Sequence, residues 1–137
     1  MSDDFPITIY HNPACGTSRN ALAMIEAAGY RPTVVEYLKT GWTRPQLETL
    51  LAAMNMRPHD VLRAKGTPAE SLGLLDPAVD DSQLLEAMLA HPVLVNRPIV
   101  VTPMGTKLAR PSEAVLDLLA RKPDSFTKED GEVVRLR

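Results

Sequence analysis

The pattern that most limits the fold of this 137-residue chain lies near its N-terminus. Ile7–Tyr10 is a short alternating run rich in β-branched residues, which predicts a strand. His11–Gly16 reads as a loop, and an apolar repeat of helical period then runs from about Thr17 to a stop at Gly29. Thr33–Tyr37 predicts a second strand. A strand, a helix and a strand within about thirty residues make a βαβ unit, whose crossover we expect to be right-handed.

The middle of the chain has helical periodicity and no strand character. Thr43 and Gln46 have the spacing of a capping box and precede an apolar stripe, which predicts a helix. Pro58 is expected to begin a short helix, and Ser82 is expected to cap a later one. We therefore predict a helical insert over about 43–92.

The strand pattern returns after this insert. Ile99–Thr102 predicts a strand, Pro103–Gly105 a tight turn, and Lys107–Arg110 an antiparallel partner. Pro111–Glu113 is expected to open a last helix, and Val133–Val134 is a weak strand-like run in the polar tail. The order is β-α-β, helical insert, β-β-α, which predicts an α/β fold with one mixed sheet flanked by helices. This order resembles the thioredoxin-like fold.

Length and composition indicate one globular domain covering residues 1–137. The chain is 45% hydrophobic and 23% charged, which argues against disorder. Its 15 Lys and Arg against 17 Asp and Glu give a net charge of −2, so it lacks the bulk charge of a non-specific nucleic-acid binder. The acidic N-terminus does not resemble a signal peptide, and no apolar run approaches the ~20 residues of a membrane span. We expect a soluble cytoplasmic protein that binds neither nucleic acid nor membrane.

Cys15 is the only cysteine, which excludes an internal disulfide and a Cys-rich zinc site. It stands between a predicted strand end and a predicted helix start, where unpaired N–H groups and the helix dipole favour the thiolate. The same position suits a bound anion. His11 and Ser18 are close enough in sequence to hydrogen-bond the sulfur. A small buried cysteine is the alternative, but the neighbouring Pro and Gly favour a reactive thiol.

Two other cysteine chemistries are tested by spacing. A redox C-x-x-C pair requires a second cysteine at position 18, where the chain has Ser18. Oxidised Cys15 must therefore be resolved by an external thiol. A phosphatase-like C-x5-R loop requires arginine at position 21, where the chain has Ala21.

Three arginines are a second indication of an anion-binding site. Arg63, Arg97 and Arg110 each lie at the boundary of a predicted element, in an otherwise apolar neighbourhood. A guanidinium fork matches two oxygens of a tetrahedral oxyanion, although an arginine taken alone is more often a surface charge. A cis bond at Pro98 would place the backbone of Arg97 near the cysteine loop. The three histidines lack metal-ligand spacing, so no metal is expected.

Three segments carry a resemblance to one family. Ile7–Asn20, Leu94–Pro103 and Arg110–Glu113 closely resemble the signatures of the glutaredoxin-coupled arsenate reductases, the ArsC family. The likeness continues to the Lys128–Gly131 segment. It implies a thioredoxin-like fold with a helical insert and a monomeric cytoplasmic enzyme. It also implies reduction of arsenate to arsenite with glutathione as co-substrate, glutaredoxin as partner and no bound cofactor.

The resemblance also implies roles for individual residues. These are the nucleophile Cys15, the thiolate-supporting His11 and Ser18, and the oxyanion-binding Arg63, Arg97 and Arg110. The match at Arg63 rests on the short motif Val61–Arg63. Pro98 matches the family's cis proline. In the implied mechanism the thiolate attacks arsenic, glutathione completes the reduction, and glutaredoxin removes glutathione from the enzyme.

Two alternatives remain open on sequence grounds. An Spx-like regulator would use the same fold to bind RNA polymerase, but such proteins typically carry C-x-x-C, against which Ser18 counts. An ArsC-like, glutathione-dependent thiol reductase that does not act on arsenate would keep Cys15 but dispense with the arginines.

Overall fold

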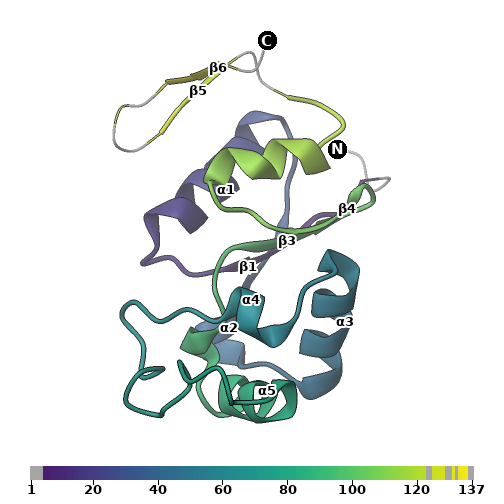
Figure 1. The fold of residues 1–137 in the computed structure, drawn as a ribbon. Helices are drawn as coiled ribbons and strands as arrows, with labels where there is room; N and C mark the ends of the chain where they lie inside the picture. The colour runs from purple at the N-terminus through teal and green to yellow at the C-terminus, as the bar shows by residue number, and fades with distance from the viewer. Residues whose placement is uncertain (1–4, 123–124, 129–130, 132, 136–137) are drawn as a thin grey trace. The chain divides into compact units, whose positions relative to one another are not determined.

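The computed structural model describes residues 5–122, 125–128, 131 and 133–135 of the chain (Figure 1). The chain divides into two compact units. The first combines residues 1–36 with residues 97–137, and the second spans residues 37–96. The two segments of the first unit are therefore joined through the second.

A four-stranded mixed sheet forms the first unit, in the order β2-β1-β3-β4. Its elements are β1 (Thr8–His11), α1 (Gly16–Ala27), β2 (Thr33–Glu36), β3 (Ile99–Thr102), β4 (Gly105–Leu108) and η2 (Ser112–Leu118). β1 pairs with β2 in parallel, whereas β3 runs antiparallel to both β1 and β4. The predicted βαβ unit, the mixed sheet and the final β-β-helix order are confirmed.

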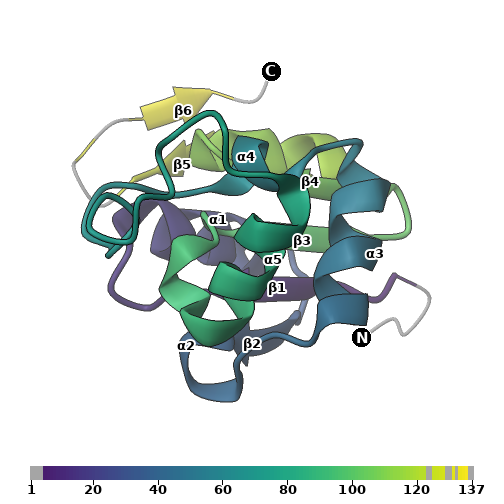
Figure 2. The same ribbon diagram turned by 60° about the horizontal axis from the view of Figure 1, so that its bottom comes forward.

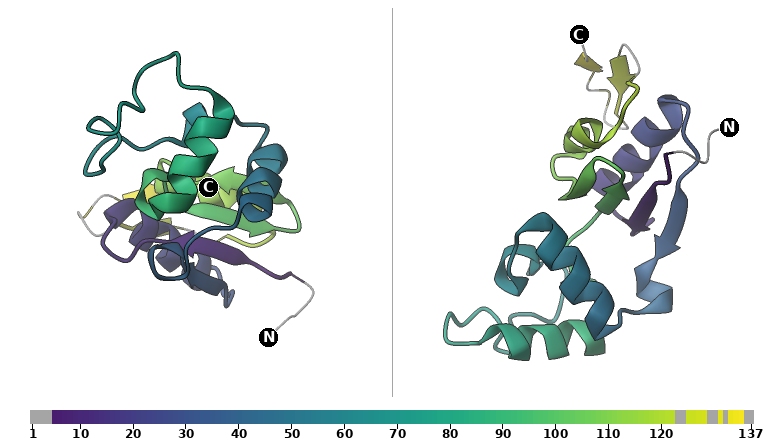
Figure 3. Two further views of the ribbon diagram at one scale, coloured as in Figure 1. Left: turned by 90° about the horizontal axis from the view of Figure 1, so that it is seen from below. Right: turned by 90° about the vertical axis from the view of Figure 1, so that its right-hand side faces the viewer.

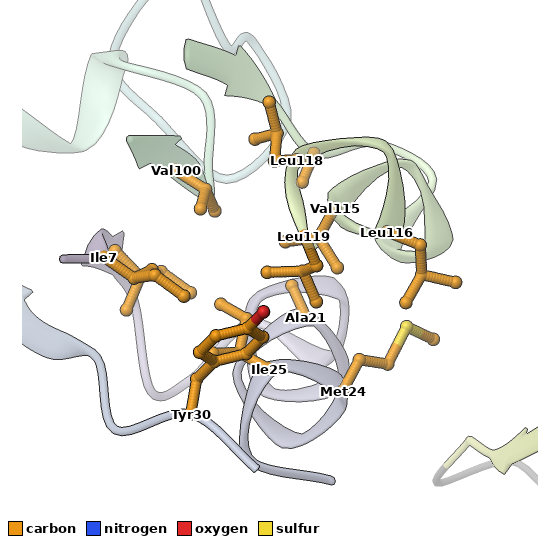
Figure 4. Close-up of a cluster of buried hydrophobic side chains, with 12 residues drawn as sticks. Ile7, Ala21, Met24, Ile25, Tyr30, Val100, Val115, Leu116, Leu118 and Leu119 are labelled. Carbon is orange, nitrogen blue, oxygen red and sulfur yellow. The ribbon is translucent and has the colours of Figure 1, made fainter. Parts of the chain in front are cut away.

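One face of α1 builds the core of this unit. Figures 1 and 3 show α1, drawn in purple, beside η2, drawn in yellow-green. Figure 4 shows the apolar side chains of these two helices meeting over the sheet. The buried cluster includes Ile9, Ala21, Met24, Ile25, Val100, Val115, Leu116, Leu118 and Leu119. Burial of each large aliphatic side chain is worth roughly 1.5–3 kcal/mol. This packing fixes the axis of α1, and with it the position of the helix N-terminus.

The ends of the first unit differ in detail from the sequence expectations. β4 begins at Gly105, which pairs with Thr102, and it ends before Arg110. Ser112–Leu118 is a 3-10 helix rather than the expected α-helix, with i→i+3 bonds such as Ala114 N–H to the Pro111 carbonyl at 2.9 Å. The weak run at Val133 is confirmed as a strand.

That strand belongs to a C-terminal hairpin that the sequence did not predict in full. β5 (Ser125–Thr127) pairs antiparallel with β6 (Val133–Arg135). Ser125–Thr127 lies directly beyond a Pro-Asp pair and is too short to show alternation, so it carries little sequence signal.

The second unit is helical, as predicted (Figure 2). Its elements are α2 (Tyr37–Thr40), α3 (Arg44–Met54), α4 (Pro58–Val61), α5 (Asp81–Ala90) and the 3-10 helix η1 (Pro92–Leu94). The capping box at α3 is confirmed, because Thr43 accepts the Gln46 N–H and Gln46 accepts the Thr43 N–H, each at 3.2 Å. α4 begins at Pro58 as expected.

The expectation that Ser82 caps the later helix is wrong. Asp80 is the N-cap of α5, since its carboxylate accepts the Gln83 N–H at 2.8 Å and its own N–H donates to the Gln83 side chain at 2.9 Å. The reciprocal box needs an acceptor three positions before Gln83, which selects Asp80 and places Ser82 within the first turn.

A testable consequence concerns Thr102 at the end of β3. Its buried hydroxyl donates to the Leu118 carbonyl at 2.7 Å and accepts the Met104 N–H at 3.0 Å. Thr102→Val keeps the branched shape but removes both bonds, so we expect the free energy of unfolding to fall by about 1–3 kcal/mol in urea titrations. Thr33→Val, at an exposed site on β2, should change it by less than about 0.5 kcal/mol. Equal losses in the two variants would contradict this role of the Thr102 hydroxyl.

Candidate active site

Cys15 lies at the junction of β1 and α1, as the sequence predicts. β1 ends at His11, and the Cys15 N–H donates to the Asn12 carbonyl at 3.0 Å, which closes a turn. Cys15 then forms the N-cap of α1 with an extended backbone (φ −100°, ψ 120°), and its carbonyl accepts the Arg19 N–H at 2.9 Å. The sulfur is buried at the positive end of the helix.

The sheet brings two of the three predicted arginines to this end of β1. β3 runs antiparallel to β1 with Tyr10 opposite Ile99, so the residues before β3 lie at the carboxyl end of β1. β4 pairs Leu108 with Ile99, and the chain after β4 returns to the same end. Arg97 and Arg110 stand at these two positions. The strand order therefore accounts for a convergence that spans much of the sequence.

Arg110 contacts both Arg97 and Cys15. Its Nη1 donates to the Arg97 carbonyl at 2.8 Å and lies 3.9 Å from Cys15 Sγ. The predicted cis bond at Pro98 is confirmed, and the Arg110–Pro111 bond is also cis. Arg110 thus holds the backbone beside the cis proline while its guanidinium faces the sulfur.

The surroundings of Cys15 act on its acidity in opposite directions. Burial raises the pKa of the thiol, because the charged form loses hydration. Hydrogen bonds from the Arg97 side chain and the Ser18 backbone N–H, the charge of Arg97 and a hydrogen bond from Arg110 lower it by more. The net effect brings the pKa from 9.0 down to about 7. The site therefore favours the thiolate at neutral pH far more than an ordinary cysteine does.

His11 and Ser18 contact one another beneath the loop. His11 Nδ1 lies 2.7 Å from Ser18 Oγ, and both residues are buried. Burial lowers the pKa of His11, against an increase from Glu36 and with a further decrease from Arg19, which favours the neutral ring. Ser18 Oγ also accepts the Asn12 N–H at 3.1 Å, so the hydroxyl links His11 to the loop. It is the backbone N–H of Ser18 that lowers the pKa of Cys15.

Arg63 belongs to the second unit. Its N–H donates to the Leu94 carbonyl at 2.8 Å, its Nε to the Lys65 carbonyl at 3.2 Å, and its Nη1 to Asn96 Oδ1 at 3.3 Å. This half-buried guanidinium is therefore held by its own unit, and its part in binding an anion stays a prediction.

Sequence reasoning missed one polar residue of the loop. Asn12 is 4% exposed, and its side-chain oxygen accepts the Ala14 N–H at 2.9 Å. The available signal was Asn followed by Pro, which favours the start of a turn. That signal marks a turn anywhere in a chain and gave no reason to place Asn12 among the functional residues.

The described part of the chain contains no cluster of side chains suited to binding a metal ion. Residues 5–122, 125–128, 131 and 133–135 contain no group of three or more His, Cys, Asp or Glu side chains placed to hold an ion. Within the same residues, no helix combines the length and the apolar character needed to cross a bilayer.

The arrangement suits nucleophilic attack by the Cys15 thiolate on the central atom of a bound oxyanion. A nucleophile ionised near pH 7 lies at a helix N-terminus, beside two guanidinium groups that supply fixed positive charge. A tetrahedral oxyanion bound here would meet both the sulfur and hydrogen-bond donors matched to its oxygens.

Comparisons with known proteins point to one family. The ArsC family profile matches residues 10–118. Arsenate reductase ArsI2 of Synechocystis sp. is 58% identical over 129 residues, covering 93% of this chain and 92% of that protein. An arsenate reductase of Rhizobium meliloti is 58% identical over 132 residues, with 93% and 92% covered. The structure of an arsenate reductase from Vibrio cholerae superposes with a TM-score of 0.79 at 36% identity, covering 84% of this chain and 98% of that one.

The acidity of Cys15 can be tested directly. Thiolate absorbance at 240 nm should rise with pH around a midpoint near 7, because the forces that favour the thiolate exceed the effect of burial. Arg97→Gln should move the midpoint toward the ordinary value of 9.0, and Arg110→Gln should move it in the same direction by less. Arg44→Gln, at an exposed ion pair with Glu86 in the second unit, is the matched control. An unchanged midpoint in Arg97→Gln would show that its guanidinium does not stabilise the thiolate.

Proposed function

The chain belongs to the ArsC family, and from this premise we propose that it reduces arsenate to arsenite, with Cys15 as the nucleophile. The observation that carries the proposal is the Cys15 thiolate, which has a pKa of about 7 and lies 3.9 Å from the Arg110 guanidinium at the N-terminus of α1. Arsenate is a tetrahedral oxyanion, so its charge and shape match the donors around the sulfur.

The first step forms a covalent adduct. Arsenate binds against Arg97 and Arg110, and the Cys15 thiolate attacks arsenic(V). An arsenic–sulfur bond forms while an arsenic–oxygen bond breaks, and the released oxygen leaves as water after protonation. The guanidinium charges stabilise the negative charge on the remaining oxygens during the attack. We propose Arg63 as a third donor to these oxygens.

The reduction itself requires a second thiol. Glutathione attacks the adduct, Cys15 and glutathione become joined by a disulfide, and arsenic takes up two electrons to become arsenic(III). Cys15 thiol, glutathione and arsenic acid thus yield the mixed disulfide, arsenous acid and water. The thiolate of glutaredoxin then attacks the glutathione sulfur, takes glutathione away and frees Cys15. Because Cys15 is the chain's only cysteine, both later thiols must come from outside.

The other members of the site have supporting roles. We propose that the His11–Ser18 pair holds the first turn of α1 so that the Ser18 N–H faces the thiolate. We also propose that the chain acts as a monomer, in the cytoplasm and without a bound cofactor, as one thioredoxin-like domain with a helical insert.

Two alternatives predict different behaviour. An Spx-like regulator would bind RNA polymerase without reducing arsenate, and Ser18 stands where such proteins carry their second cysteine. A thiol reductase that does not act on arsenate has no need for two guanidinium groups at its sulfur, so the contacts of Arg97 and Arg110 favour the arsenate reaction.

The central test is turnover in a coupled assay. Purified protein with arsenate, glutathione, glutaredoxin and glutathione reductase should consume NADPH, and replacing arsenate by phosphate should abolish the consumption. Cys15→Ser should show no arsenate-dependent consumption but an unchanged circular dichroism spectrum, since the hydroxyl is a weak nucleophile of similar size. Turnover that persists in Cys15→Ser would refute the covalent mechanism.

The arginines can be tested in the same assay. Arg97→Lys and Arg110→Lys keep the charge but lose the planar fork, so kcat/KM for arsenate should fall about 10- to 100-fold, as expected for a lost charged hydrogen bond of ~1.5–3 kcal/mol. Arg44→Lys, at a partly exposed arginine paired with Glu48 and Glu86 in the second unit, should retain the wild-type value. Unchanged kcat/KM in both site variants would rule out their assignment.

A further inference from the structure

The turn that delivers Cys15 to α1 is built around Asn12. Asn12 Oδ1 accepts the Ala14 N–H at 2.9 Å, and the Asn12 carbonyl accepts the Cys15 N–H at 3.0 Å. Pro13 occupies the second position, where its fixed φ suits a turn. Asn12 thus uses its side chain and its backbone carbonyl to bend the chain within the four residues from Asn12 to Cys15.

The chain contains the same turn a second time, in the second unit. Asp76 Oδ1 accepts the Ala78 N–H at 2.9 Å, and the Asp76 carbonyl accepts the Val79 N–H at 3.1 Å. Pro77 again occupies the second position. The two turns share their residue pattern and their hydrogen bonds, so the features that differ between them show what is special to Asn12.

Two features separate the Asn12 turn from the Asp76 turn. Asn12 is 4% exposed, whereas Asp76 lies on the surface. The Asn12 N–H also donates to Ser18 Oγ at 3.1 Å, which ties the turn to the first turn of α1. Burying a polar side chain is costly unless its hydrogen bonds are made, so the buried amide is held in one orientation.

We propose that Asn12 is a positioning residue for the reaction, which fixes the direction of the Cys15 sulfur relative to Ser18 and Arg110. It acts through the Cys15 backbone on one side and through Ser18 on the other, and it does not itself need to touch the substrate. The proposal rests on the assignment of Cys15 as the nucleophile in the proposed function.

The stabilisation of the thiolate depends on where the sulfur lies. The Arg110 contact to Sγ is long, at 3.9 Å, and the Ser18 backbone N–H in the first turn of α1 also acts on the sulfur. Its stabilisation by the Ser18 N–H and the arginines therefore depends on small displacements of the sulfur. Without the Asn12 oxygen, the Ala14 N–H loses its partner and the turn gains freedom directly before Cys15.

The test compares Asn12→Ala with Asn12→Ser and with the matched turn variant Asp76→Ala. Serine keeps a hydroxyl oxygen that can accept the Ala14 N–H, although more weakly than asparagine. Folding is followed by circular dichroism and thermal unfolding, the Cys15 midpoint by thiolate absorbance at 240 nm, and kcat and KM by the coupled arsenate assay.

We expect Asn12→Ala to raise the Cys15 midpoint by about one pH unit and to lower kcat more than it raises KM, because the arginines that bind the anion stay in place. Asn12→Ser should recover part of both effects. Asp76→Ala should lower the melting temperature at most slightly and leave the midpoint and kcat at their wild-type values. A role in stability alone would change the melting temperature without moving the midpoint.

Three results would overturn the proposal. The first is a folded Asn12→Ala protein with a wild-type midpoint, and the second is an equal midpoint shift in Asp76→Ala. The third is failure of both Asn12 variants to fold, which would make Asn12 a stability residue. If only Asn12→Ala fails to fold, the midpoint of Asn12→Ser decides by the same criterion. Absence of arsenate turnover in the wild-type protein would count against the proposed function instead, since the titration needs no arsenate.

Discussion

Burial and positive charge act in opposite directions on the pKa of Cys15, and the rest of the site depends on the balance between them. Burial alone would keep the thiol protonated at neutral pH, because the interior hydrates the thiolate poorly. Arg97, Arg110 and the Ser18 N–H reverse this preference and bring the pKa to about 7. Each of these groups must be held close to the sulfur, since their effect decreases with distance. The other features of the first unit can be understood as supplying that fixed geometry.

The sheet and its core supply the geometry in two steps. The apolar face of α1 packs with η2 over the sheet, which fixes the helix N-terminus at the end of β1 (Figure 4). The antiparallel β3–β4 hairpin then carries Arg97 and Arg110 to the same end of the sheet. The Arg110 bond to the Arg97 carbonyl joins the two arginine segments at 2.8 Å. A stable core thus sets the electrostatics of a small polar site.

Local sequence patterns predicted most helices and strands of the first unit, but they did not predict which side chains form hydrogen bonds with one another. Alternation marked β1, the run Ile99–Thr102 marked β3, and Gly29, with φ +94°, marked the end of α1 correctly. The resemblance of three segments singled out Arg97 and Arg110 from the other arginines, which spacing alone did not. The bond between His11 and Ser18, the buried turn at Asn12 and the Asp80 cap depend on which of several nearby acceptors a donor reaches. That choice is settled by packing in three dimensions, which sequence period does not encode.

A pKa near 7 serves both thiol steps of the proposed cycle. In the attack on arsenate, a lower pKa would raise the thiolate fraction but reduce the nucleophilicity of the sulfur, so the best attacking thiol has a pKa close to the ambient pH. In the final step, glutaredoxin attacks the glutathione sulfur and Cys15 becomes the leaving group, which departs faster when its pKa is low. The same guanidinium groups therefore assist both ends of the cycle. Because the chain has no second cysteine to displace the first, an external thiol replaces the internal resolving thiol of a C-x-x-C protein, and the low pKa of Cys15 eases that exchange.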